Sequence, residues 1–174
     1  AEVRKQLGPI TGLIHGAGVL ADSLIEHKTH EQFDRVFGTK ALGLASLLCG
    51  TASDPLRVLV LFSSVVARAG NPGQADYAMA NEVLNRVARI EARRRGPACL
   101  VKSINWGAWA AGMMTPELRA LFAGRGISLL SPDEGATRFV AELLAEARDE
   151  TEVVIGDDPR KLAKPGTSAD SQKV

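Results

Sequence analysis

The sequence has little of several features that mark particular protein classes. It has two cysteines, Cys49 and Cys99, and no CxxC pair, so a disulfide framework is excluded and we expect two reduced thiols. No apolar run approaches the roughly 20 residues that span a bilayer, and the first residues lack the apolar core of a signal peptide. Net charge is only +1, so neither nucleic acid nor an anionic membrane is expected as a partner. These absences favour a cytoplasmic protein, and no residue pattern predicts a metal site.

What is present is a pattern of short apolar runs that alternate with helical segments. We predict strands over residues 10–15, 57–62, 98–105 and 152–155; the run RVLVLF at 57–62 is the strongest. We predict helices over 29–50, 74–95, 115–125 and 132–148, three of which begin at Thr29, Thr115-Pro116 and Ser131-Pro132. Alternating strands and helices predict an α/β fold with a parallel sheet.

The extent of the domain follows from composition. Residues 1–156 carry the strand and helix pattern, and from residue 157 to 174 the chain turns polar with Lys, Pro, Gly and Ser. We therefore expect one domain over 1–156 and a flexible tail or linker over 157–174. Four strands are fewer than a doubly wound sheet usually has.

A glycine motif follows the first predicted strand. The run HGAGVLA at residues 15–21 matches the dinucleotide fingerprint G-x-G-x-x-A. That fingerprint requires a helix to start at the motif, whereas the next predicted helix begins near Thr29. Three interpretations remain open: a pyrophosphate loop, a tight turn without ligand, or a strand end whose small residues approach a flat cofactor ring. We favour the last.

Four side chains form the candidate catalytic set. Ser64 ends the strongest strand, where ligands bind in open α/β sheets. Tyr77, the only tyrosine in the chain, begins the helix predicted at 74–95, and Asn81 lies one turn later on the same face. Lys40 lies on the earlier helix. Each residue alone has an ordinary structural explanation, such as packing for Tyr77 or solvation for Lys40; the combination is what indicates catalysis.

Several segments resemble the ketoreductase domains of type I polyketide and polyunsaturated fatty acid synthases, members of the short-chain dehydrogenase/reductase superfamily. They are LIHGAGVLADSLI, FGTKALGL, LVLFSSVVARAGNPGQADYAMANEVLN and INWGAWAAGMM. In that family the catalytic tyrosine comes 13 residues after the serine and 37 residues after the lysine, and an asparagine comes four residues after the tyrosine. Tyr77 has the same spacings to Ser64, Lys40 and Asn81. The resemblance implies a Rossmann-like sheet with flanking helices, and NADPH-dependent reduction of a 3-ketoacyl thioester on an acyl carrier protein.

The resemblance also implies roles for these residues. Tyr77 donates the proton to the carbonyl oxygen, Ser64 orients that carbonyl, and the ammonium of Lys40 lowers the pKa of Tyr77. Asn81 holds Lys40 or a relay water. The implied cofactor contacts are Ala17, Gly18, Ser63, Tyr77, Trp106 and Gly107. Trp109 serves as a core or lid anchor, and Met113 and Met114 belong to a substrate lid or to ordinary packing.

Compared with the family, the N-terminal βαβ half of the fold is missing, so we expect the chain to start within the fold. Its partners would then be that missing half or another synthase chain, and the fragment alone would be nearly inactive. The segment Leu20-Ala21-Asp22 keeps one of two aspartates typical of 3R products, and Ala69 stands where the opposite class has tryptophan; we expect the 3R alcohol. The alternatives are a structural half-domain of a synthase and a free-standing dehydrogenase acting on small alcohols.

Overall fold

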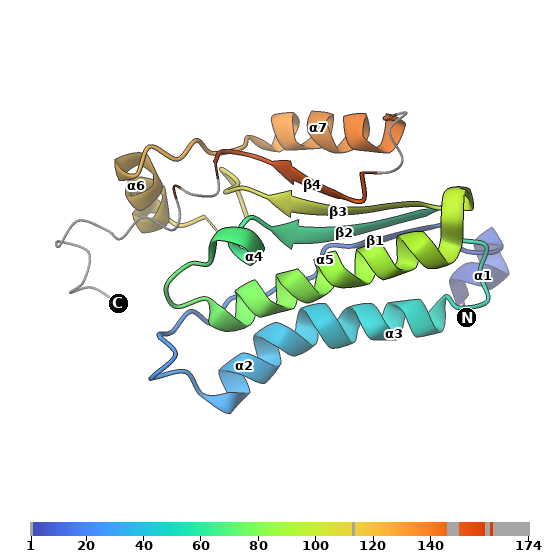
Figure 1. Cartoon of the computed structure of the whole chain (residues 1–174), viewed down its shortest axis with the longest axis horizontal. Helices are drawn as coiled ribbons and strands as arrows, with labels where there is room; N and C mark the ends of the chain where they lie inside the picture. The colour runs from blue at the N-terminus through green and yellow to red at the C-terminus, as the bar shows by residue number, and fades with distance from the viewer. Residues whose placement is uncertain (1, 113, 146–149, 159–160, 162–174) are drawn as a thin grey trace.

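A parallel four-stranded sheet forms the centre of the fold (Figure 1). The computed structural model describes residues 2–112, 114–145, 150–158 and 161. The strands lie in the order β1-β2-β3-β4, and neighbours are parallel throughout. They are β1 (Gly12–His15), β2 (Val58–Ser64), β3 (Leu100–Trp106) and β4 (Glu152–Ile155). The predicted α/β class and all four predicted strands are confirmed.

Helices connect the strands and cover both faces of the sheet (Figure 1). The α-helices are α1 (Glu2–Leu7), α2 (His30–Phe37), α3 (Gly43–Gly50), α4 (Val66–Ala69), α5 (Ala75–Arg95), α6 (Pro116–Gly124) and α7 (Pro132–Leu144). The predicted starts are confirmed, because Thr29, Thr115 and Ser131 each accept a main-chain N–H of the following first turn. These side-chain caps fix where three helices begin.

Two details differ from the sequence expectation. The single helix expected over 29–50 is helical throughout, but it contains the π-helical turn η1 (Gly38–Leu42) between α2 and α3. The short helix α4 lies between the strand predicted at 57–62 and the helix predicted at 74–95, where no helix or strand was predicted. A π turn inserts one extra residue into a helix, while the spacing of apolar residues within the helical segments before and after it stays the same. The sequence pattern therefore did not reveal it.

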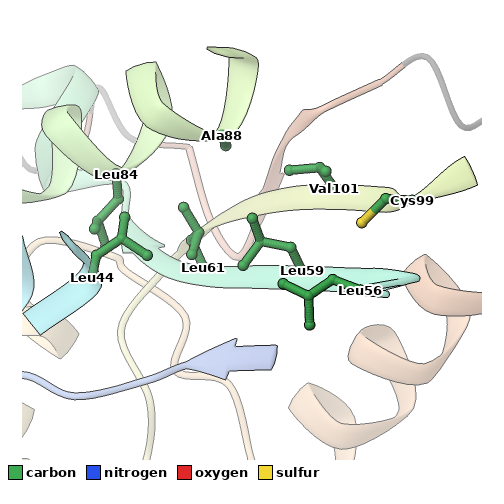
Figure 2. Close-up of a cluster of buried hydrophobic side chains, with 8 residues drawn as sticks. All are labelled: Leu44, Leu56, Leu59, Leu61, Leu84, Ala88, Cys99 and Val101. Atoms are coloured by element: carbon green, nitrogen blue, oxygen red, sulfur yellow. The ribbon is translucent and has the colours of Figure 1, made fainter. Parts of the chain in front are cut away.

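The core contains three apolar clusters: one on each face of the sheet, and a smaller one formed by Val65, Val66 and Ile127. In the first, Leu44 of α3 and Leu84 of α5 pack against Leu59 and Leu61 of β2 (Figure 2). The second cluster joins β2 and β3 to α7. Each fully buried leucine of this kind contributes about 1.5–3 kcal/mol to stability through burial. The central strands are apolar on both faces because helices cover both.

Some of the predictions fall outside the described residues. Residues 146–149, the end of the helix predicted over 132–148, lie there, as do 159–160 and 162–174 of the predicted tail. Within that tail, Asp157 accepts the main-chain N–H of Ser128, and the ammonium of Lys161 contacts Asp157 and the carbonyl of Gly126. No helix among the described residues is long and apolar enough to cross a membrane.

Candidate active site

A cavity of about 560 Å³ opens at the carboxyl ends of the strands. β2 and β3 pair from Val58 with Leu100 to Ser64 with Trp106, so their last residues lie side by side at its wall. Seven of the predicted site residues line the cavity: Gly18, Lys40, Ser63, Ser64, Tyr77, Trp106 and Gly107. Ala17 is exposed and does not line it, and Asn81 is completely buried behind the wall. The fold thus brings together most of the residues that the sequence singled out.

The glycine segment faces this cavity as a strand end. Residues 16–24 contain no helix, so the arrangement required of a pyrophosphate loop is absent from this segment. A Cβ atom on Gly18 would lie 3.3 Å from Cε of Lys40, which is tighter than ordinary contact. The absence of a side chain at Gly18 therefore lets the Lys40 side chain reach the cavity.

Lys40 reaches the cavity from the π-helical turn η1. The main-chain carbonyl of Lys40 accepts a hydrogen bond from Nε2 of His15 at 2.9 Å. Burial lowers the pKa of His15, which favours the neutral ring, and the carbonyl acceptor fixes the proton on Nε2. His15, which the sequence pattern did not assign to the site, thus supports the turn that presents Lys40.

The Lys40 ammonium is buried, with only 4% of the residue exposed. Nζ donates to the carbonyl of Phe62 at 2.8 Å and lies 5.6 Å from the centroid of the Tyr77 ring. Burial lowers the pKa of Lys40 from 10.5 to about 8. Lys40 is therefore still mostly charged at neutral pH and close to the phenol, and among the described residues its ammonium bonds to a carbonyl rather than to a carboxylate.

Tyr77 departs from the sequence expectation in its pKa. Burial raises the pKa of Tyr77, and hydrogen bonds with the side chains of Ser64 and Asn81 lower it only in part. Lys40 is not among the groups that shift the pKa of Tyr77 in this structure, where its ammonium donates to the carbonyl of Phe62. The phenol is consequently protonated at neutral pH, which is the form that can donate a proton.

Asn81 and Ser63 make hydrogen bonds that the sequence did not indicate. Nδ2 of Asn81 donates to the main-chain carbonyl of Tyr77 at 2.8 Å rather than contacting Lys40. Oδ1 of Asn81 is buried and has no hydrogen-bond partner among the described residues. The hydroxyl of Ser63, which also lines the cavity, is 3.1 Å from both the carbonyl oxygen of Asn81 and Oδ1 of Asn105.

Behind this wall lies a buried polar network. Oδ1 of Asn105 on β3 also accepts from Asn85 of α5 at 3.0 Å, and Nδ2 of Asn105 donates to Glu152 of β4 at 3.1 Å. The network joins α5 to three strands and holds its first half, which carries Tyr77, against the sheet. Sequence reasoning missed it; the available signal was polar residues at buried positions of an otherwise apolar strand and helix.

The two tryptophans also line the cavity. Their ring centroids lie 4.8 Å apart, and Trp106 is only 5% exposed, with its Nε1 unpaired among the described residues. A Cβ on Gly107 would lie 3.0 Å from Cα of Gly156, so this glycine permits two strand ends to approach each other. Trp109 packs directly over Gly135 of α7, which is the anchoring role considered for it.

Apolar side chains from the segment around α6 close one side of the cavity. Met114, Leu118, Phe122 and Ile127 line it, whereas Met113, also expected in a lid, lies outside the described residues. Asp22, which also lines the cavity, accepts a hydrogen bond from Gln74 at 2.7 Å, and burial raises the pKa of Asp22. The lining thus combines apolar side chains that suit an acyl chain with a few polar groups.

A buried wall of Ser, Tyr and Lys at the carboxyl ends of a parallel sheet defines a Rossmann-like α/β protein with a site suited to proton transfer. Comparison with known proteins extends this description. The family model described as the KR domain matches residues 1–111. The chain belongs to the ketoreductase family.

Curated relatives and solved structures agree with that assignment. The chain is 41% identical over 167 residues to a polyunsaturated fatty acid synthase polypeptide of Thraustochytrium sp., and 37% identical over 136 residues to an erythronolide synthase of Saccharopolyspora erythraea. These matches cover 95% and 78% of the chain. A ketoreductase domain from the bacillaene assembly line superposes with a TM-score of 0.77 at 30% identity over 92% of the chain.

The matches cover only part of each relative. The chain spans 6% of the polyunsaturated fatty acid synthase polypeptide, 4% of the erythronolide synthase and 40% of the bacillaene ketoreductase chain. The family match and the superposition establish a Rossmann-like ketoreductase fold of the short-chain dehydrogenase/reductase type.

Proposed function

We propose that this chain carries the proton-transfer side of an NADPH-dependent ketoreductase that reduces a 3-ketoacyl thioester to the 3-hydroxyacyl form. The observation that carries the proposal is the convergence of Ser64, Tyr77 and Lys40 on one cavity at the carboxyl ends of the strands. Family membership gives the reaction class, and the cavity gives the residues.

The chemistry assigns one task to each side chain. The hydroxyls of Ser64 and Tyr77 donate hydrogen bonds to the ketone oxygen and hold the carbonyl in place. A bound nicotinamide would supply the hydride to the carbonyl carbon. As negative charge develops on the oxygen, Tyr77 transfers its phenolic proton to it, which completes the alcohol. We propose that the Lys40 ammonium, still cationic at neutral pH but bonded to the carbonyl of Phe62 in this structure, turns toward the phenolate as it forms and stabilises it.

The residues present fit a flat cofactor ring. The cavity of about 560 Å³ lies in the range typical of small-molecule sites. Gly16 and Gly18 leave bare backbone in the cavity lining, Trp106 adds an aromatic ring to it, and Gly107 follows Trp106 in the chain and also lines the cavity. NADPH, rather than NADH, follows from the family resemblance and not from a residue of this chain.

The substrate proposal rests on the apolar side of the cavity. Flexible Met114 with Leu118 and Phe122 suits an acyl chain delivered on the phosphopantetheine arm of an acyl carrier protein. The 3R product is proposed because Asp22 is retained, and it lines the cavity beside Gln74. Product chirality, read by chiral chromatography of the released hydroxy acid, tests this part separately.

The partner proposal rests on one edge of the sheet. Among the described strands β1 pairs only with β2, and Ile14 on that edge strand is 53% exposed. Unpaired edges with apolar side chains favour pairing with another segment. We propose that the N-terminal part of a ketoreductase domain, or another synthase chain, occupies this edge and completes the cofactor site.

A complementation assay tests the proposal. The chain is mixed with a separately expressed N-terminal half of a ketoreductase domain, NADPH and a 3-ketoacyl N-acetylcysteamine thioester, and absorbance is followed at 340 nm. We expect little turnover from either part alone and reduction from the mixture. Strong activity of the chain alone would overturn the partner proposal. If the two parts associate but no hydroxyacyl product forms, the proposed function is wrong.

A further inference from the structure

A buried ion pair lies directly beside Tyr77. Nζ of Lys28 is 2.9 Å from Oδ2 of Asp76, and the side chains are 5% and 1% exposed. The same ammonium donates to the carbonyl of Ala21 at 2.9 Å, and Oδ1 of Asp76 accepts the main-chain N–H of Tyr77 at 2.9 Å. One carboxylate therefore holds both the segment that follows β1 and the backbone of Tyr77.

Two further contacts join the same segments. Nε2 of Gln74 donates to Asp22 at 2.7 Å, and the N–H of Ser23 donates to the carbonyl of Gly73 at 2.9 Å. All of these contacts lie where α5 begins and where Tyr77 enters the cavity. The segment after β1 and the start of α5 are two walls of one site, fastened to each other at this point.

A purely structural role does not account for the ion pair. An acidic residue in the first turn of α5 is favourable without a lysine partner, because it interacts with the helix dipole. The start of α2 is capped by Thr29 and does not need Lys28. Burying two charges is expensive, and well-packed apolar residues often replace such pairs without loss of stability. The ion pair therefore serves to fix the direction in which the chain runs at Tyr77.

We infer that Lys28 and Asp76 form a buried latch, the Lys28–Asp76 latch, that sets the depth of the Tyr77 phenol in the cavity. Both are positioning residues, since neither lines the cavity. The inference rests on the proposed function only in treating Tyr77 as the proton donor. The position of the phenol itself can be measured without turnover, because Tyr77 is the only tyrosine in the chain.

The test uses the 174-residue chain labelled with ¹³Cζ-tyrosine, which gives one resonance whose titration reports Tyr77. The variant Lys28→Met/Asp76→Asn removes both charges, so neither is left buried alone. Lys102→Met/Glu142→Gln is the matched control: Lys102 is 1% exposed and pairs with Glu142 at 3.3 Å, between β3 and α7 and outside the cavity lining.

We expect the pKa of Tyr77 to fall toward its ordinary value in the latch variant, because the phenol becomes more exposed, and to stay unchanged in the control. Asp22 acts electrostatically on Tyr77 and Lys40 lies over its ring, and neither is substituted. Lys28 lowers and Asp76 raises the pKa of Asp22, so removing both charges takes away two opposing effects on Asp22. Lys28→Arg retains the pair and should titrate as the wild type does. In the complemented reductase assay, the latch variant should lose roughly tenfold or more in kcat with KM unchanged.

A folded latch variant, by circular dichroism, that keeps the wild-type titration of Tyr77 would overturn the inference. If that variant does not fold, Asp76→Glu is used in its place. Its longer side chain should shift the Tyr77 resonance, whereas the control Glu142→Asp should not. An unchanged Tyr77 resonance in Asp76→Glu would reject the latch. If the wild-type chain shows no reduction when complemented, the proposed function fails, while the titration still tests the latch.

Discussion

Replacing Lys40 tests whether a residue of the candidate site lowers the folding stability of the chain. Its pKa of about 8, against an ordinary 10.5, means that the folded chain binds this proton less well than the unfolded chain does. At about 1.4 kcal/mol for each pH unit, the depression costs about 3 kcal/mol of folding stability at pH 7. Lys40→Met removes that cost but leaves the carbonyl of Phe62 without its donor, a loss of about 1 kcal/mol.

The pH dependence follows from the sign of the shift. Below pH 8 both the folded and the unfolded chain carry protonated Lys40, so the cost is constant. Between pH 8 and 10.5 the unfolded chain keeps a proton that the folded chain has lost, so wild-type stability rises with pH. The variant should therefore be more stable than the wild type by about 2 kcal/mol at pH 7 and nearly equal to it at about pH 10.

Urea unfolding at both pH values measures this difference. Lys102→Met is the control, because its equally buried lysine is paired with Glu142; it should not stabilise the chain at pH 7. If Lys40→Met is less stable than the wild type at pH 7, or if the difference does not shrink by pH 10, burial does not depress the pKa of Lys40. The account of Lys40 as a residue retained for function at the expense of stability would then be wrong.

Two substitutions test the packing around the site. A Cβ on Gly135 would overlap the ring of Trp109, so Gly135→Ala should destabilise the chain by about 1–3 kcal/mol and shift its tryptophan fluorescence. A Cβ on Gly124 meets no atom within 4 Å, so the control Gly124→Ala should change neither quantity. Equal stability of the two variants would contradict this packing. Leu84→Ala should lose about 2–5 kcal/mol in urea unfolding, and Ile90→Ala, 60% exposed on the same helix, should lose far less; similar losses would refute the assigned core.

The strands and helix starts could be predicted from the sequence because local patterns determine them. The run RVLVLF is apolar on both faces, as a central parallel strand must be, and it became β2. Thr29, Thr115 and Ser131 cap their helices by contacts within three residues. The site set Ser64, Tyr77 and Lys40 was found because its spacings match a family, and the fold does bring these three to one cavity.

Features that depend on distant partners could not be predicted. The π turn at Lys40 is supported by His15, 25 residues away, and the pKa of Tyr77 depends on burial that no local pattern reveals. The partner of Lys28 is 48 residues along the chain, so neither residue looked unusual in the sequence. The close approach of Gly107 to Gly156 could not be predicted either, because the two glycines are far apart in the sequence.

The central claim is that Tyr77 supplies the proton for ketone reduction, and one substitution tests it most directly. Tyr77→Phe removes only the phenolic hydroxyl, so in the complemented assay we predict that kcat falls by roughly 10²–10⁴. The Kd for NADPH, measured by fluorescence titration, should stay within about threefold of the wild type, because the aromatic ring at this implied cofactor contact is retained. A Tyr77→Phe chain that reduces the 3-ketoacyl thioester at the wild-type rate would contradict the account.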